Sequence, residues 1–171
     1  SKYEPTGEKD DILREQAKHW GKPGLHYHQF LDAGENTLNL QLACELYREI
    51  IKSGEFDLSG WLDRYAEVML TPGWHNDTYA EEYHRAFFTN YARGKKLSNC
   101  GISDLHIGGL SLVPALLAGL EAIGQTDEKH LIESTRLLVK ATHNHPDTLG
   151  AARDLTRIII SLRKGTGIRN T

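Results

Sequence analysis

The feature that most constrains the fold is a helical repeat of apolar residues between about residues 36 and 53. Leucine or isoleucine recurs at every fourth position, at Leu38, Leu42, Leu46 and Ile50. Residues with this spacing lie on one face of an α-helix. Gly54 follows the repeat and favours the end of a helix. The stretch therefore predicts a helix with one face buried in a core.

The same period recurs along the chain, and alternation typical of strands is nearly absent. Further helices are expected over residues 8–20, 58–70, 76–94, 108–124, 126–143 and 145–165. Short loops separate these segments, and no internal repeat is evident. We therefore expect one all-α domain over residues 1–171, an orthogonal bundle of six or seven helices.

Helix starts can be predicted from side chains that accept hydrogen bonds from the unpaired N–H groups of the first turn, and from proline, which has no N–H group. Asp57 is expected to cap the helix over 58–70, and Asn76 or Asp77 the one over 76–94. Thr126 is expected to cap the next-to-last helix, and Pro146 suits the first position of the last helix. The aromatic residues of the 76–94 segment share one helical face, which favours packing over cofactor binding.

Composition excludes several classes of protein. Of 171 residues, 39% are hydrophobic and 25% charged, and the net charge is −3, so no positive field favours nucleic acid or an anionic membrane. No apolar run approaches the roughly 20 residues that span a bilayer. Cys44 and Cys100 have no metal-ligand spacing. We expect a soluble, cytoplasmic protein, whose oligomeric state the sequence leaves open.

A polar cluster directly precedes the first strongly periodic helix. Glu35, Asn36 and Thr37 can be explained as helix-capping residues, with Asn36 as the N-cap, because a helix start attracts polar and acidic groups. Carboxylate, amide and hydroxyl oxygens are also ligands for a hard cation such as Mg²⁺. Spacing alone does not separate these two hypotheses.

Two other loops carry polar or glycine-rich patterns. His143 and His145 flank an asparagine just before Pro146, where a loop could direct both rings into one cleft or leave them partly exposed. Gly108 and Gly109 precede an apolar segment, where they could approach a phosphate or simply permit tight packing. The central hypothesis is that these loops meet the 35–37 cluster in one hollow.

Taken in order, several segments resemble the ADP-ribosylglycohydrolase family, closest to the branch of selenoprotein J and the J-type lens crystallins. "HYHQFLDAGENTLNLQLACEL" is similar to the family's Thr-Asp-Asp-Thr metal motif and following helix, and "HNDTYAEEYHRAFFTNYARGKK" to the aromatic helix of the crystallin branch. "HIGGLSLVPALLAGL" and "ATHNHPDTLGAA" resemble two later segments. The resemblance covers roughly residues 25–162.

The resemblance implies an all-α fold and a Mg²⁺-dependent hydrolase that cleaves the glycosidic bond of ADP-ribose conjugates. It places Glu35, Asn36 and Thr37 as metal ligands, with Glu35 also catalytic. It also implies a set of substrate-binding residues that contact ADP-ribose or an ADP-ribosylated substrate: His106, Gly108, Gly109, Ser111, His143 and His145.

The chain departs from the family pattern in ways that weaken the metal site. Asn36 stands in place of an aspartate, which removes one charge that would hold a divalent cation, and Ser111 stands where the family commonly has arginine. The family's opening and late metal motifs are missing, so we expect either a fragment or a reduced relative. Two alternatives stay open: a non-catalytic crystallin-like structural protein, and a module that binds ADP-ribose without turnover.

Overall fold

The computed structural model describes residues 3–26 and 28–165, and the fold is all-helical. In chain order the elements are η1 (Arg14–His19), α1 (Leu38–Ser53), α2 (Leu58–Leu70), α3 (Glu82–Ala92), η2 (Leu97–Asn99), η3 (Ile107–Leu110), α4 (Val113–Ala122), α5 (Glu128–Lys140) and α6 (Pro146–Arg163). The described residues form no strand, and their one β-bridge joins Ile102 to His143. The expected all-α class is confirmed.

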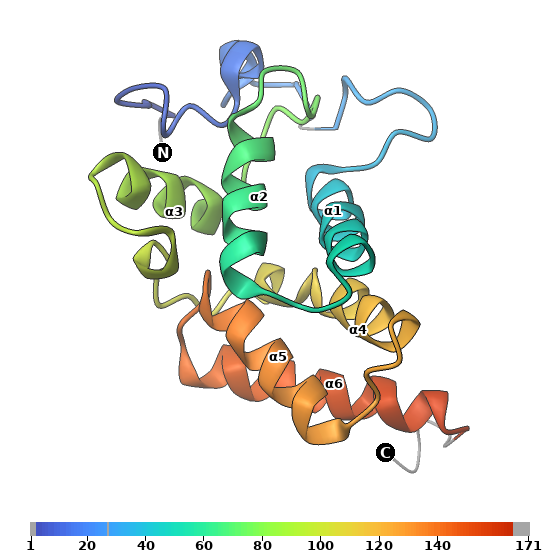
Figure 1. Cartoon of the computed structure of the whole chain (residues 1–171). Coiled ribbons are helices and arrows are strands. Elements are labelled where there is room, and N and C mark those ends of the chain that lie inside the picture. The colour runs from blue at the N-terminus through green and yellow to red at the C-terminus, as the bar shows by residue number, and fades with distance from the viewer. Residues whose placement is uncertain (1–2, 27, 166–171) are drawn as a thin grey trace.

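The helices form two groups that cross each other (Figure 1). α1 and α2 run side by side in opposite directions, and α3 lies beside α2. Below them, α4 packs across α1, while α5 and α6 lie against each other and against α4. In the described part of the chain before α1, η1 is the only helical element, and this part passes across the start of α1 and the end of α2.

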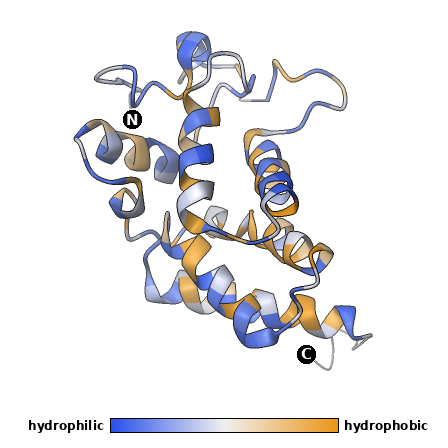
Figure 2. Cartoon of the chain, in the orientation of Figure 1, coloured by the Kyte–Doolittle hydropathy of each residue, from blue (hydrophilic) through white to orange (hydrophobic). Residues whose placement is uncertain are grey.

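A glycine of α4 lies at the contact between α1 and α4. A Cβ atom added to Gly119 would lie 3.1 Å from Cδ1 of Ile50, so a larger residue would require the Ile50 side chain to shift. Ile50 and Leu46 are buried, as the four-residue repeat predicts. α4 is hydrophobic along most of its surface, as Figure 2 shows, because it lies between α1 and the α5–α6 pair.

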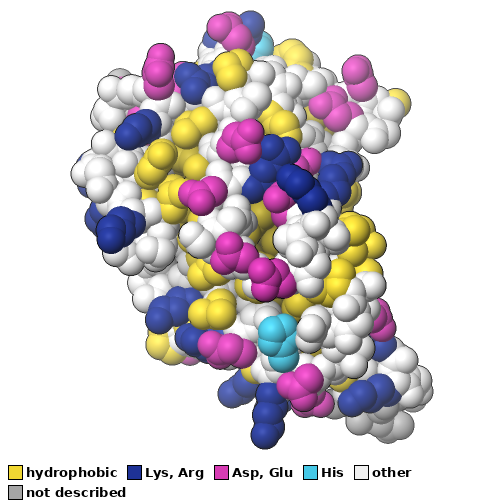
Figure 3. Space-filling view, viewed as in Figure 1, with side chains coloured by type: hydrophobic (Ala, Val, Ile, Leu, Met, Phe, Trp, Pro, Cys, Tyr) yellow, Lys and Arg dark blue, Asp and Glu magenta, His cyan; other side chains and the backbone are white. Residues whose placement is uncertain are grey.

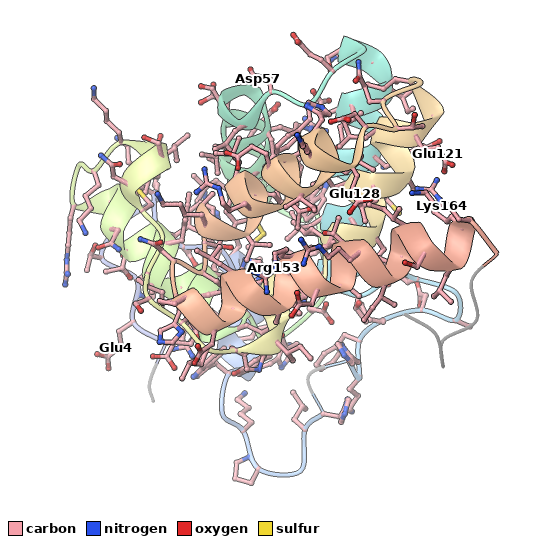
Figure 4. The ribbon with its side chains drawn as sticks, turned by 90° about the horizontal axis from the view of Figure 1, so that it is seen from below. Glu4, Asp57, Glu121, Glu128, Arg153 and Lys164 are labelled. Carbon is pink, nitrogen blue, oxygen red and sulfur yellow. The ribbon has the colours of Figure 1, made fainter. Side chains whose placement is uncertain are left out.

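Several expected helix boundaries are confirmed. The side chain of Asp57 accepts hydrogen bonds from the N–H groups of Ser59 and Gly60, and α6 begins at Pro146. Figure 4 shows Asp57 at the start of its helix.

Three other expectations are wrong. The 8–20 segment forms only the 3₁₀ helix η1, and its few apolar residues include Ile12 and Leu13, which are buried side by side. The cap of α5 is Asp127 rather than Thr126. α3 begins at Glu82, several residues after the expected start, because the preceding segment is committed to contacts with α1.

Charged side chains connect the helices at their surfaces. Glu45 on α1 accepts hydrogen bonds from Arg48 and from Arg64 on α2. The ends of α4, α5 and α6 meet where Glu121 pairs with Arg163 and Glu128 with Lys164, and Figure 4 shows this end of the bundle. Figure 3 shows acidic and basic side chains mixed across one face.

Among the described residues, none of the helices combines the length and the apolar character needed to cross a membrane.

Candidate functional site

A polar cleft of about 450 Å³ lies where the start of α1 meets the segment before α3 and the loop before η3. This volume falls within the range of small-molecule sites. We name it the N-terminal cleft, because it opens at the N-terminus of α1. It is lined by His28, Thr37, Leu38, Asn39, Asp77, Tyr79, Glu81, His84 and His106. Among these described lining residues there are two carboxylates and three histidines but no lysine or arginine.

Asp77 holds the start of α1 from a distant part of the chain. Its Oδ2 atom accepts a hydrogen bond of 2.5 Å from the N–H of Leu38, and its Oδ1 atom lies 2.7 Å from Nδ1 of His28. The side chain is 2% exposed. A carboxylate suits this place because the unpaired N–H groups at a helix start carry a partial positive charge. Asp77 therefore caps α1 rather than α3.

A chain of hydrogen bonds runs from the core to the cleft. Nδ1 of His84 lies 2.5 Å from the hydroxyl of Tyr65, and Nε2 lies 3.2 Å from Oδ1 of Asn39. The amide nitrogen of Asn39 then donates to Oε2 of Glu81 at 3.1 Å. Burial lowers the pKa of His84 well below its usual value, so the ring is neutral. A second hydroxyl, that of Tyr83, also donates to Oδ1 of Asn39 at 3.2 Å.

His106 also lines the cleft, and Gly108 packs against it. Nδ1 of His106 accepts a hydrogen bond from the N–H of Gly108, so a neutral ring carries its proton on Nε2. A Cβ atom added to Gly108 would lie 2.8 Å from Nδ1 of His106 and 3.1 Å from Oε2 of Glu81. Glycine is therefore required here for close packing against both side chains.

Two residues that follow Gly108 do not line the cleft. Gly109 and Ser111 line a cavity of about 20 Å³, which His84 also borders. A Cβ atom added to Gly109 would lie 2.6 Å from Cγ of His143. Gly109 and His143 are therefore in contact with each other, although neither lines the cleft. This contact shows Gly109 as a packing residue.

His143 is fully buried and does not line the cleft, which departs from the expected placement in the pocket. Its Nδ1 atom lies 2.9 Å from Oγ1 of Thr142, and the centre of its ring lies 4.4 Å from that of the tilted ring of Tyr83. Burial lowers its pKa, although the nearby carboxylate of Asp104 opposes the change. His145 instead caps α6, where its Nδ1 atom accepts a hydrogen bond from the N–H of Asp147.

The three residues expected to hold Mg²⁺ have different surroundings. Glu35 accepts hydrogen bonds from the side chain of Asn76 at 2.7 Å and from the N–H of Asp32 at 2.9 Å. Asn36 is exposed, and of the three only Thr37 lines the cleft. Thr37 is also the N-cap residue of α1, so the expectation that Asn36 takes this position is wrong.

No group of three or more His, Cys, Asp or Glu side chains within residues 3–26 and 28–165 could hold a metal ion. A protein-enclosed Mg²⁺ centre needs several oxygen atoms around one position. Glu35 is the one carboxylate of the predicted set, and both its oxygens accept hydrogen bonds from protein groups.

A second cleft of about 450 Å³ lies elsewhere, between the start of α2, η2 and the end of α5. Its lining includes Lys140, Asn99 and Asn144. None of the residues that the sequence assigned to a ligand lines it. The two clefts therefore have the same volume, but only the N-terminal cleft is lined by residues that the sequence assigned to a ligand.

Sequence reasoning missed Asn39, Asp77, Glu81 and His84 as cleft residues. Asn39 has an identifiable signal, because it is a polar residue on the first turn of an amphipathic helix. Asp77 was one of two expected caps of the 76–94 helix, and Glu81 lies within that segment, near a helix start where acids are common. Only the tertiary arrangement shows that their segment turns toward α1.

No protein family, curated protein or solved structure matches this chain. The resemblance to ADP-ribosylglycohydrolases therefore stays a prediction.

Proposed function

We propose that the N-terminal cleft is the substrate site of an ADP-ribosylglycohydrolase-like hydrolase, which cleaves the glycosidic bond of ADP-ribose conjugates. One observation carries the proposal. Thr37 and His106, which the resemblance assigns to the metal and substrate segments, line the same cleft although they are far apart in the sequence. Such convergence is expected if both segments serve one ligand.

The charge of the cleft suits the cleavage of a glycosidic bond. Positive charge develops at the anomeric carbon of the sugar in the transition state of this reaction. The carboxylates of Asp77 and Glu81, with no lysine or arginine among the described lining residues, give the cleft a negative potential. That potential favours the sugar part of the substrate next to these two carboxylates, because phosphates would be repelled from them.

Mg²⁺ remains the cofactor expected from the resemblance, and its role can be tested separately. Titration calorimetry of ADP-ribose is the direct experiment, with and without Mg²⁺, followed by an assay for release of ADP-ribose from a conjugate. Saturable binding would support the cleft as a substrate site. Binding without turnover would favour the alternative of an ADP-ribose-binding module, and no binding with or without Mg²⁺ would contradict the proposal.

A second candidate function is that of a crystallin-like structural protein. The hydrogen bonds of two acidic residues favour it. Both oxygens of Asp77 and both oxygens of Glu35 already contact groups of the protein. Acids satisfied in this manner stabilise the fold without a ligand. This candidate predicts that neither Mg²⁺ nor ADP-ribose changes the melting temperature, whereas a ligand that binds the folded state would raise it.

A further inference from the structure

Glu81 differs from the other acids near the N-terminal cleft in how its side chain is held. Asp77 is 2% exposed and both its oxygens are engaged, whereas the Glu81 side chain is 26% exposed. Glu81 is also the N-cap residue of α3, but its side chain makes no capping hydrogen bond. Its carboxylate is therefore available to the cleft and is not needed to start the helix.

The hydrogen bonds that connect Tyr65 to Glu81 through His84 and Asn39 have one consistent donor-to-acceptor direction. Oδ1 of Asn39 can only accept, so Nε2 of the neutral His84 ring must donate to it. Nδ1 of His84 must then accept from the hydroxyl of Tyr65. This leaves the amide nitrogen of Asn39 to donate to Glu81, so every proton in the chain points toward the carboxylate.

Burial makes this arrangement rigid. Tyr65 is 3% exposed and His84 is 1% exposed, so neither can exchange its partner for water. Turning the Asn39 amide over would bring its Oδ1 atom against Oε2 of Glu81, so two acceptors would face each other and the hydrogen bond to the carboxylate would be lost. Gly108 also packs close to Oε2 of Glu81.

We infer that Glu81 is the residue of the N-terminal cleft that contacts the ligand, that it accepts hydrogen bonds from sugar hydroxyls, and that Tyr65, His84 and Asn39 are positioning residues for it. This inference rests on the proposed function and deepens it. An ionised carboxylate only accepts hydrogen bonds, so it selects hydroxyl groups and repels phosphate. The ribose part of the ligand therefore lies against Glu81.

The side-chain amide of Asn39 provides a direct probe, because it donates to Glu81. We expect D-ribose to shift the ¹⁵N and ¹H resonances of this amide in a saturable way, and inorganic phosphate to leave them unchanged. Glu81→Gln should weaken D-ribose binding at least about tenfold, since a hydrogen bond to a charged group is lost. Glu82→Gln is the matched control, because Glu82 is the next residue on α3 and is exposed.

The positioning role has its own readout. The ¹⁵N shifts of the His84 ring should identify a neutral ring protonated on Nε2 in the native protein. Tyr65→Phe should change that pattern and weaken D-ribose binding, whereas Tyr91→Phe should change neither, because Tyr91 lies on α3 outside the network. Unchanged ring shifts together with unchanged binding in Tyr65→Phe would overturn the positioning role.

The same titrations separate this inference from the proposed function. Binding of D-ribose that depends on Glu81, without binding of ADP-ribose, would support the inference and contradict the proposed function. Binding of ADP-ribose that is equal in Glu81→Gln and the native chain would contradict the inference alone. If neither D-ribose nor ADP-ribose shifts the Asn39 amide, or if phosphate shifts it, the inference is wrong.

Discussion

The carboxylate of Asp77 accepts a hydrogen bond from the backbone N–H of Leu38, a residue 39 positions earlier in the chain. The contact fixes the start of α1 against the segment that leads into α3. Leu38 and Asp77 both line the N-terminal cleft, so the contact also forms part of the cleft wall. The same carboxylate thus stabilises the fold and shapes the candidate site.

The first prediction compares the stability effects of replacing Asp77 and Asn36, two polar residues near the start of α1. Asp77→Ala should lower the free energy of unfolding by about 1–3 kcal/mol, because a buried N–H group loses its partner. Asn36→Ala should change it by less than about 0.5 kcal/mol, because Asn36 is exposed and does not cap the helix. Urea denaturation of both variants checks this. Equal losses would show that α1 is not capped by Asp77.

A second prediction concerns the glycine that meets His143. Gly109→Ala should destabilise the protein by about 1–3 kcal/mol, because the added methyl group overlaps a fully buried ring. Gly150→Ala is the control, since a Cβ atom there meets nothing within 4 Å. Gly150 lies inside α6, so alanine should stabilise the protein by about 0.5–1 kcal/mol. Thermal melts check both variants. An unchanged melting temperature in Gly109→Ala would contradict the close packing of Gly109 against His143.

The fold could be predicted from the sequence to a larger extent than the site. The repeat from Leu38 to Ile50 indicates a buried helix face, because apolar residues at the helical period form one apolar side that packs into a core. Asp57 and Pro146 act on their own helices, so their roles could also be predicted. Each of these signals is contained within a few residues.

The roles of Asp77 and Glu81 could not be predicted, because each depends on a partner some forty residues away. Their segment contains acids at a plausible helix start, and local rules assign them to that helix. His143 illustrates the same limit. Its loop position favours exposure, yet packing of its ring against Tyr83 and Gly109 buries it completely.

A third prediction concerns pH. Burial lowers the pKa of His75, His84 and His143, so each is neutral in the folded protein, while the unfolded chain takes up protons near pH 6.5. The unfolded state then binds more protons below that pH. Stability should therefore be highest above about pH 6.5 and fall as the pH drops toward the lower pKa values of the folded state, by up to about 1.4 kcal/mol per pH unit for each histidine.

Urea unfolding at several pH values between neutral and moderately acidic checks this dependence. His75→Gln should reduce the slope, because one buried titrating group is removed. His130→Gln is the control, because His130 is exposed on α5 and should leave the slope unchanged. A stability that rises as the pH falls through this range would contradict the neutral state of the buried histidines.

The most direct test of the central claim is to map where ADP-ribose binds, by following backbone amide resonances as it is added with and without Mg²⁺. The N-terminal cleft and the second cleft have equal volumes of about 450 Å³, so size alone does not favour either. We predict saturable shifts at Asn39, Glu81 and His106, with none at Asn99 or Lys140. Shifts confined to the second cleft, or no shifts at any ligand concentration, would contradict the claim.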